Sequence, residues 1–275
     1  MSNFLLRTVS GVLFVASIIG ALIIGEISFL IVYAAVLILS MYEFYTLTHK
    51  ARIKPQIFLG ILIGLSLFIA SYLYANGYIE GILLNGFIPI IMSIFIFELY
   101  RNHRRPFHNI AFTYLGILYI AIPISLFNFI VFNSTSINTT YSFDILLGYF
   151  FLIWANDTGA YLFGVSIGKH KLFPRISPKK SWEGFFGGII FTTIIAWAIS
   201  HYFHNITFAH WLMIGLISAI AGVFGDLVES MYKRSLEVKD SGKFLPGHGG
   251  ILDRFDSIYL SAPLVFAYLK LMMLV

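Results

Sequence analysis

The densest group of reactive side chains lies between Ser230 and Asp256, where cations, acids, glycines and a histidine crowd together. Lysine and arginine neutralise phosphate oxygens, and arginine can do so through two parallel hydrogen bonds. Glycines let a backbone approach a ligand closely and aim its N–H groups at it. The segment therefore indicates phosphate chemistry. We predict catalytic roles for Lys233, Arg234, His248 and Arg254, and substrate-binding roles for Lys239, Asp240, Gly249 and Gly250.

Aspartates flank this segment on both sides. Asp226 precedes it, and a helical spacing would place Glu229 and Ser230 on the same face as Asp226. Asp253 and Asp256 are three residues apart and would share one helical face. Oxygen-only acidic ligands next to phosphate-binding groups favour Mg²⁺ over zinc. We predict Asp226, Asp253 and Asp256 as metal ligands, with Asp226 and Asp253 also catalytic, and we allow for a second, monovalent cation such as K⁺.

Another polar pair, Asn156 and Asp157, interrupts an otherwise apolar run. An acid inside a membrane-spanning segment costs about 2.5–3.5 kcal/mol on insertion scales and usually faces the bundle interior or a wet cavity. We therefore predict that both residues line a substrate cavity. The alternative is a structural polar clamp between helices.

The segment Ser177-Pro-Lys-Lys-Ser181 precedes the next apolar run. Ser177 or Ser181 would cap a helix there, and Pro178 suits a first helical position. A helix N-terminus with two lysines outlines a phosphate site, so we predict substrate-binding roles for Ser177, Lys179 and Lys180. The alternative is a basic loop that holds lipid headgroups.

The elements that must position these residues are membrane helices. Of the 275 residues, 59% are hydrophobic and 11% are charged, whereas soluble domains carry about 25% charged residues. Runs of about 20 apolar residues, the length that crosses a bilayer, recur along the chain. We predict an all-α integral membrane protein with about nine transmembrane helices. The expected spans are Phe4–Gly25, Ile27–Leu47, Gln56–Ala75, Gly81–Tyr100, Ile110–Phe132, Phe143–Ile167, Gly184–Tyr202, Phe208–Met231 and Phe255–Val275.

The loops between these spans predict their orientation. Lysine and arginine gather in every second loop, and loops such as Asn133–Asp144 contain neither. Because short basic loops stay in the cytoplasm, we place the N-terminus inside and the active site at the cytoplasmic ends of the C-terminal helices. We expect N-terminal transmembrane helices over residues 1–140. Residues 141–275 would form the catalytic region, with cytoplasmic loops at 168–183 and 232–254.

Two features of the composition narrow the chemistry further. The chain lacks cysteine, which excludes disulfides and thiolate metal sites. The net charge of +5 follows from basic cytoplasmic loops and requires no nucleic acid partner.

The segment Ser230–Asp256 closely resembles the signature of the phosphatidate cytidylyltransferases, or CDP-diacylglycerol synthases. Ser230, Lys233-Arg234, Lys239-Asp240, His248-Gly-Gly250, Asp253-Arg254 and Asp256 match every fixed position of that signature. Tyr232 departs slightly, since the family usually has a plain apolar residue there. The segment Ser177–Glu183 and the pair Asn156-Asp157 also resemble the family, so the likeness extends in motif detail from Asn156 to Asp256.

The resemblance implies a transferase of phospholipid biosynthesis that converts CTP and phosphatidate into CDP-diacylglycerol and pyrophosphate with Mg²⁺. It implies membrane lipid as a partner, a homodimer, and a multi-pass location in a bacterial cell membrane. A cytidylyltransferase for archaeal-type or polyprenyl lipids remains an alternative, because the headgroup chemistry is identical. A CDP-alcohol phosphotransferase would need its own aspartate-rich motif, and a transporter would show inverted repeats. A P-loop motif is also absent from the sequence.

Overall fold

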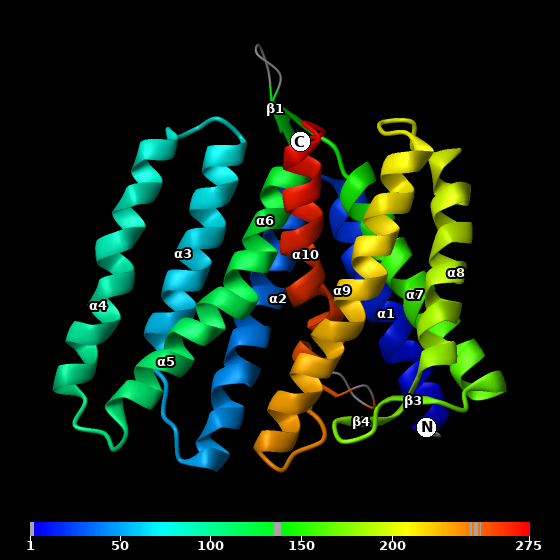
Figure 1. The fold of residues 1–275 in the computed structure, drawn as a ribbon. Helices are drawn as coiled ribbons and strands as arrows, with labels where there is room; N and C mark the ends of the chain where they lie inside the picture. Colours follow the sequence, from blue (N-terminus) through cyan, green and yellow to red (C-terminus); the bar gives the residue numbers. More distant parts are fainter. Residues whose placement is uncertain (1–2, 135–138, 243, 245–246, 248) are drawn as a thin grey trace. The chain divides into compact units, whose positions relative to one another are not determined.

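The computed structural model describes residues 3–134, 139–242, 244, 247 and 249–275. It is mostly helical, and a helix occupies the place of each predicted span (Figure 1). The α-helices are α1 (Asn3–Ile24), α2 (Glu26–Leu47), α3 (Ile57–Ala75), α4 (Phe87–Tyr100), α5 (Pro106–Gly116), α6 (Ile122–Val131), α7 (Asp144–Ile167), α8 (Trp182–Ser200), α9 (Phe208–Ser235) and α10 (Leu252–Leu271). Short 3₁₀ helices, Thr48–Ala51 and Gly81–Gly86, follow α2 and precede α4.

The fifth predicted span consists of α5 and α6 joined by one π-helical turn, Ile117–Ala121. Pro123 lies at the start of α6, directly after this turn. A proline lacks the N–H that would continue the helical ladder, and a π-turn is a common way to accommodate such a break. The span is therefore continuous although its sequence contains a proline.

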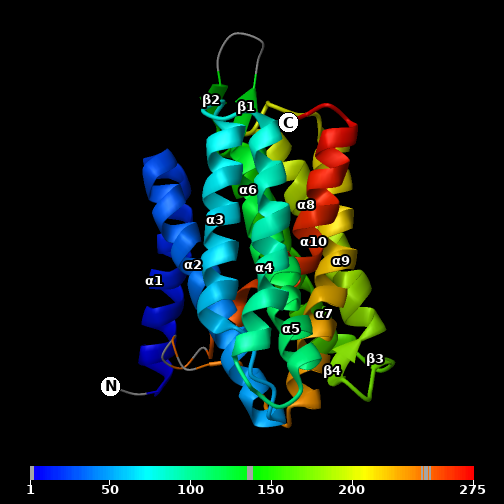
Figure 2. The same ribbon diagram turned by 90° about the vertical axis from the view of Figure 1, so that its left-hand side faces the viewer.

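Two short antiparallel hairpins depart from the all-helical prediction. The hairpin of β1 (Phe132–Ser134) and β2 (Thr139–Tyr141) follows α6 and pairs Phe132 with Tyr141 (Figure 2). The hairpin of β3 (Lys171–Phe173) and β4 (Ser177–Ser181) connects α7 to α8. Strands of three to five residues are too short to show a clear alternation of polar and apolar side chains.

Within the described part of the chain, six helical segments are long and apolar enough to cross a membrane. They comprise α2 to α6, α8 and α9 with their adjoining turns. The middle of α7 contains the polar residues Asn156 and Asp157. The first turns of α10 contain Asp253, Arg254 and Asp256. These polar residues lower the apolar character of helices that carry predicted site residues. The count of nine spans and their orientation stay predictions.

The chain divides into two compact units. The first comprises residues 1–141 and 236–255, and the second comprises residues 142–235 and 256–275. In the first unit α2 packs against α1 and α3, and α3 packs against α6. Its core is aromatic, with Phe29, Tyr33, Phe44, Tyr45, Phe68 and Phe127 fully or almost fully buried.

The second unit is built on α7, α8 and α9, each of which contacts the other two. Tyr149 of α7 and Trp211 of α9 are fully buried in its core. The Tyr149 hydroxyl also forms a 2.6 Å hydrogen bond with the Ser261 hydroxyl of α10. This bond satisfies two buried polar groups and ties α7 to the part of α10 that belongs to this unit. The predicted division at residues 140 and 141 stays a prediction.

Candidate active site

Close packing of α7 against α8 forms one wall of the candidate site. A Cβ atom added to Gly184 would lie 2.8 Å from the Ala160 carbonyl oxygen, and one added to Gly159 would lie 2.8 Å from the Gly187 oxygen. Neither backbone could yield to that extent, so only glycine fits at these contacts. Small residues allow membrane helices to approach in this way. The C-terminal half of α7 and the N-terminus of α8 are thereby held side by side.

The hairpin β3–β4 leads into α8 through a capped helix start. The Ser181 hydroxyl oxygen accepts a 3.1 Å hydrogen bond from the Gly184 N–H, which satisfies one of the free donors at the helix N-terminus. This confirms the prediction that Ser181 caps a helix. The alternative, a cap at Ser177 with Pro178 in the first turn, is wrong. Residues 177–181 instead pair with β3.

Glu183, in the first turn of α8, fixes the other end of this connection. Its carboxylate accepts hydrogen bonds of 3.2 Å from the His170 backbone N–H and lies 2.6 Å from the His170 Nδ1 atom. The His170 carbonyl oxygen in turn accepts from the Trp182 N–H at 2.9 Å. The segment that carries Lys179 and Lys180 is therefore anchored at both of its ends.

A cavity of about 320 Å³ opens between these elements and α9, wholly within the second unit. Four predicted substrate-binding residues and one predicted metal ligand line it. Ser177 lies in β4 and is not part of the lining. The lining residues are Asn156, Asp157, Ala160, Tyr161, Gly164, Leu172, Lys179, Lys180, Ser181, Gly184, Phe185, Val223 and Asp226.

An ion pair crosses this cavity from the hairpin to α9. The Lys180 ammonium lies 2.6 Å from the Asp226 carboxylate and 3.4 Å from the Val223 carbonyl oxygen. The Ser230 hydroxyl donates a 3.1 Å hydrogen bond to the other Asp226 oxygen, as the spacing on α9 predicts. Lys180 and Asp226 are both partly shielded from solvent, so their attraction is stronger than that of an exposed pair.

Asp256 adds a further carboxylate to this group. It interacts electrostatically with Asp226, Asp157 and Lys180. Gly225 makes this approach possible, because a Cβ atom at that position would lie 2.5 Å from the Asp256 carbonyl oxygen. The result is three carboxylates near one lysine. In the residues that the structure describes, no three acid or histidine side chains converge closely enough to bind a metal ion. The predicted metal set therefore stays a prediction.

Asn156 is the buried polar residue of the cavity wall. It is 3% exposed, and its Oδ1 atom has no hydrogen-bond partner among the described residues. Leaving a buried acceptor unpaired costs about 1–3 kcal/mol. Asp157, the next residue, lines the same cavity but is exposed. The Asn156 Oδ1 atom also lies against α8, 2.5 Å from where a Cβ atom of Gly188 would be. The role of the pair in lining a substrate cavity stays a prediction, as does the alternative of a polar clamp between helices.

Two further predicted residues, Lys233 and Arg234, lie at the end of α9 and are not part of the cavity lining. Glu229 is fully buried, and its carboxylate lies 2.5 Å from the Lys233 ammonium one helical turn later. Arg234 is exposed near the end of the same helix. The helix extends four residues beyond the predicted span, so Lys233 and Arg234 lie on α9 instead of in a loop. Lys233 therefore neutralises a buried acid, in addition to any contact with phosphate.

The remaining predicted residues belong to the first unit. The Asp253 carboxylate accepts hydrogen bonds from the Ser241 N–H at 3.1 Å and from the Gly250 N–H at 2.9 Å. Gly249 has a φ of +84°, a conformation that favours glycine. Lys239, Asp240 and Arg254 are exposed. His248, which we predict to be catalytic, lies outside the described residues.

One buried acid at this segment escaped the sequence analysis. Glu43 of α2 is 7% exposed, and its carboxylate accepts hydrogen bonds from the Leu252 N–H at 2.9 Å and the Ser241 hydroxyl at 3.2 Å. The sequence does mark Glu43, because it is an acid inside a predicted span, and ionisable residues in such spans are functional candidates by default. Both partners are distant in sequence, which is why spacing alone gave no indication of them.

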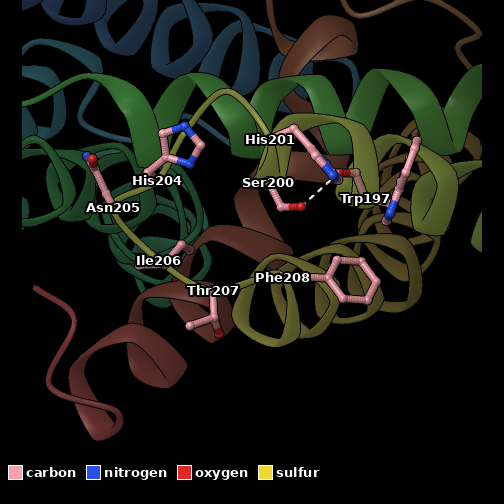
Figure 3. Close-up of a pocket in the computed structure, with 8 residues that line it drawn as sticks. All are labelled: Trp197, Ser200, His201, His204, Asn205, Ile206, Thr207 and Phe208. Atoms are coloured by element: carbon pink, nitrogen blue, oxygen red, sulfur yellow. Dashed lines mark hydrogen bonds between the residues drawn. The ribbon is translucent and has the colours of Figure 1, made fainter.

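A larger cavity of about 490 Å³ lies at the other end of α8 (Figure 3). Figure 3 shows Ser200 and His201 turned toward the Trp197 backbone, whose carbonyl oxygen lies 2.7 Å from the Ser200 hydroxyl and 2.8 Å from the His201 Nδ1 atom. The lining includes no lysine, arginine or acid among the described residues. It offers a phosphate histidines but no lysine or arginine from the described residues, so the cavity lined by Lys179 and Lys180 is the candidate active site.

Comparisons with known proteins support a nucleotide-transfer chemistry. The model of a family described as "Cytidylyltransferase family" matches residues 5–272 of the chain. A phosphatidate cytidylyltransferase from Staphylococcus aureus (strain COL) is 39% identical over 194 residues, which cover 70% of this chain and 71% of the relative. The enzyme of that name from Staphylococcus haemolyticus (strain JCSC1435) is 38% identical over 209 residues, covering 75% and 77%.

Proposed function

Because the chain belongs to the cytidylyltransferase family, we propose that it transfers CMP from CTP to phosphatidate and releases pyrophosphate. The product is CDP-diacylglycerol, an intermediate of phospholipid biosynthesis. The observation that carries the proposal is the cavity of the second unit, where Lys179, Lys180, Asn156 and two aspartates meet. It offers cations for phosphate oxygens and acids for a counter-ion within one cavity.

The reaction is an in-line displacement at phosphorus. A phosphate oxygen of phosphatidate forms a bond to the α-phosphorus of CTP, and the bond from that phosphorus to the bridging oxygen of the β-phosphate breaks. Pyrophosphate takes the bonding electrons and leaves. A phosphomonoester has a second pKa of about 6, so much of the nucleophile is already dianionic and needs little help from a general base.

The main barrier is repulsion between two polyanions, so charge neutralisation and positioning dominate the catalysis. Lys179 is exposed at the cavity and is free to approach an incoming phosphate. Lys180 is held by Asp226 and delivers a fixed positive charge. Asn156 lines the same cavity, where its side-chain amide would hydrogen-bond a polar group of the substrate.

The chemistry of these side chains, in contrast to their spacing among the described residues, suits a hard divalent cation. Asp226 and Asp256 interact with each other and with Asp157, and lysine is the cation that balances them in the structure. Carboxylate oxygens without nitrogen or sulfur ligands suit Mg²⁺. Asp226 and Asp256 would hold Mg²⁺, which would neutralise phosphate charge. Asp253, which belongs to the first unit, stays a metal ligand predicted from the sequence alone. A second, monovalent cation such as K⁺ and a homodimeric assembly belong to the same proposal.

The reaction requires a lipid phosphate to meet a water-soluble nucleotide at the membrane surface. Lys179 and Lys180 precede α8, and Lys233 and Arg234 end α9, so within the second unit these cations gather at one end of the helices. Basic segments remain on the cytoplasmic side of membrane proteins. We therefore place the active site on the cytoplasmic face of the bacterial membrane.

Two labelled forms of CTP test the reaction type. Purified protein in detergent with phosphatidate and Mg²⁺ should move label from the α-phosphate of CTP into the lipid extract. Label from the γ-phosphate should appear in pyrophosphate. Diacylglycerol in place of phosphatidate, and ATP in place of CTP, serve as controls and should give no labelled lipid. Transfer of the γ-label into lipid would indicate a kinase and overturn the proposal.

A further inference from the structure

The two ends of the segment 241–252 meet at two carboxylates of the first unit, those of Asp253 and Glu43. Ser241 donates its backbone N–H to Asp253 and its hydroxyl to Glu43. At the other end, Gly250 donates to Asp253 and Leu252 donates to Glu43. Each carboxylate therefore accepts one bond from Ser241 and one from the stretch Gly250–Leu252. Asp253 is local to the segment, whereas Glu43 comes from α2, about two hundred residues earlier in the chain.

Glycines on both sides of the Glu43 carboxylate leave it room. A Cβ atom added to Gly242 would collide with Glu43 Oε1, and one added to Gly250 would collide with Glu43 Oε2 and the Ser241 hydroxyl. Neither residue has a positive φ, so conformational freedom does not explain the glycines. They are needed because the carboxylate occupies the space that a side chain would take.

The bond to Leu252 has a specific structural consequence. Leu252 is the first residue of α10, whose opening turn carries Asp253 and Arg254. The first N–H groups of a helix have no partner within it, and a carboxylate there both accepts a hydrogen bond and favours the positive end of the helix dipole. Glu43 thus acts as a helix cap supplied by another helix. It sets where α10 begins and, with it, the direction of Asp253.

We propose that Glu43 is a positioning residue, which holds Ser241, Leu252 and the first turn of α10 in the geometry required for CMP transfer. This inference rests on the proposed function. It assigns to α2, a helix without a predicted site residue, a direct part in arranging the phosphate-binding segment. Glu43 acts through Ser241, Leu252 and Asp253 and has no assigned contact with substrate.

The first test separates positioning from simple stability. Glu43→Gln keeps the shape and one acceptor but loses the charge, and Glu43→Ala removes both. We expect kcat to fall about 10²-fold for Glu43→Ala, because small displacements of catalytic groups have effects of this size. The KM for CTP should change much less, and Glu43→Gln should recover part of the loss. Glu26→Gln, at the opposite end of α2, is the matched control and should keep wild-type kinetics.

A double-mutant cycle tests the contact itself. Gly242→Ala should lower kcat in the wild-type background, because its Cβ displaces the Glu43 carboxylate. In the Glu43→Ala background the same change should have no further effect, since the obstructing group is gone. If the double variant instead shows the product of the two single-variant losses in kcat, the two residues act independently and the proposal is overturned. If Glu43→Ala fails to accumulate in membranes, Glu43→Ser, which also removes the group that the Gly242 Cβ would meet, replaces it in the cycle.

Amide hydrogen exchange gives a readout that does not depend on turnover. Exchange over residues 241–252 should accelerate in Glu43→Ala and stay unchanged in Glu26→Gln. Unchanged exchange together with unchanged kcat in the Glu43 variants would contradict a positioning role. If exchange is faster in Glu43→Ala but the wild-type protein shows no CMP transfer, the structural role of Glu43 holds and the proposed function is rejected.

Discussion

At the scale of single residues, the Lys180–Asp226 pair is the centre of the candidate site. Lys180 joins the hairpin to α9 through its ion pair with Asp226, and it also interacts electrostatically with Asp256. Removing it would leave partly shielded negative charges beside a polyanionic substrate, which is costly when solvent screening is weak. The Lys180 ammonium therefore balances carboxylate charge in the free site and would neutralise phosphate charge when substrate binds.

Lys180→Gln should lower kcat/KM for CTP by about 10²-fold, the usual effect of removing one preorganised charge-stabilising donor. Lys171→Gln is the matched control, because Lys171 is an exposed lysine of the same hairpin and lies outside the cavity lining. Steady-state assays in mixed micelles of detergent and phosphatidate give both values. A Lys180 variant that matches the Lys171 control would remove Lys180 from the site.

Much of this site is recognisable in the sequence at the residue scale. Asn156, Asp157, Lys179, Lys180 and Asp226 were all predicted, and the structure brings them to one cavity. Their signal was local, because polar residues inside apolar runs are conspicuous. The Glu229–Lys233 pair and the role of Glu43 were not predicted. The burial of Glu229 and the contact of Glu43 with residues about two hundred positions later both depend on tertiary packing. A local sequence pattern contains no information about either.

At the scale of elements, glycine contacts between α7 and α8 hold the cavity wall in place. Gly159 meets the backbone of α8 directly, with the Gly187 oxygen 2.8 Å from where its Cβ would be. A neighbouring backbone cannot rotate away as a flexible side chain can. The contact therefore couples the packing of these two helices to the position of Asn156 and Asp157.

Gly159→Ala should destabilise the protein by about 1–3 kcal/mol through overpacking, lowering the melting temperature by roughly 2–4 °C per kcal/mol. Gly20→Ala in α1 is the control, because no atom lies within 4 Å of its added Cβ. Alanine forms helices more readily than glycine by about 1 kcal/mol, so the control should be neutral or stabilising. Thermal unfolding in detergent compares the two. A Gly159 variant as stable as the Gly20 variant would contradict the packing account.

The helices were predictable because apolar runs of membrane length are strong signals, and each predicted span contains a helix. Their ends were less predictable. The end of α9 at Ser235 and the start of α10 at Leu252 place Lys233, Arg234 and Arg254 on helices, although the predicted cytoplasmic loop spans 232–254. Charge marks the membrane boundary in a sequence, whereas a helix ends where its hydrogen bonds and caps end.

At the scale of the whole molecule, the pattern of basic loops predicts which face carries the chemistry. The chain has no cysteine, so single cysteines introduced into it can be labelled without interference. His103→Cys lies in a predicted cytoplasmic loop and His204→Cys in a predicted outer loop, and both positions are exposed. A membrane-impermeant maleimide should label the second variant in intact cells and the first only after permeabilisation. The reverse result would invert the predicted topology.

The central claim is that this membrane protein, a member of the cytidylyltransferase family, uses CTP and phosphatidate together. The most direct measurement is pyrophosphate release by detergent-purified protein given CTP, Mg²⁺ and phosphatidate. We predict release only when all three are present, and its loss on chelation of the metal. Release without phosphatidate, or none with any lipid phosphate acceptor under a range of monovalent ions, would contradict the account.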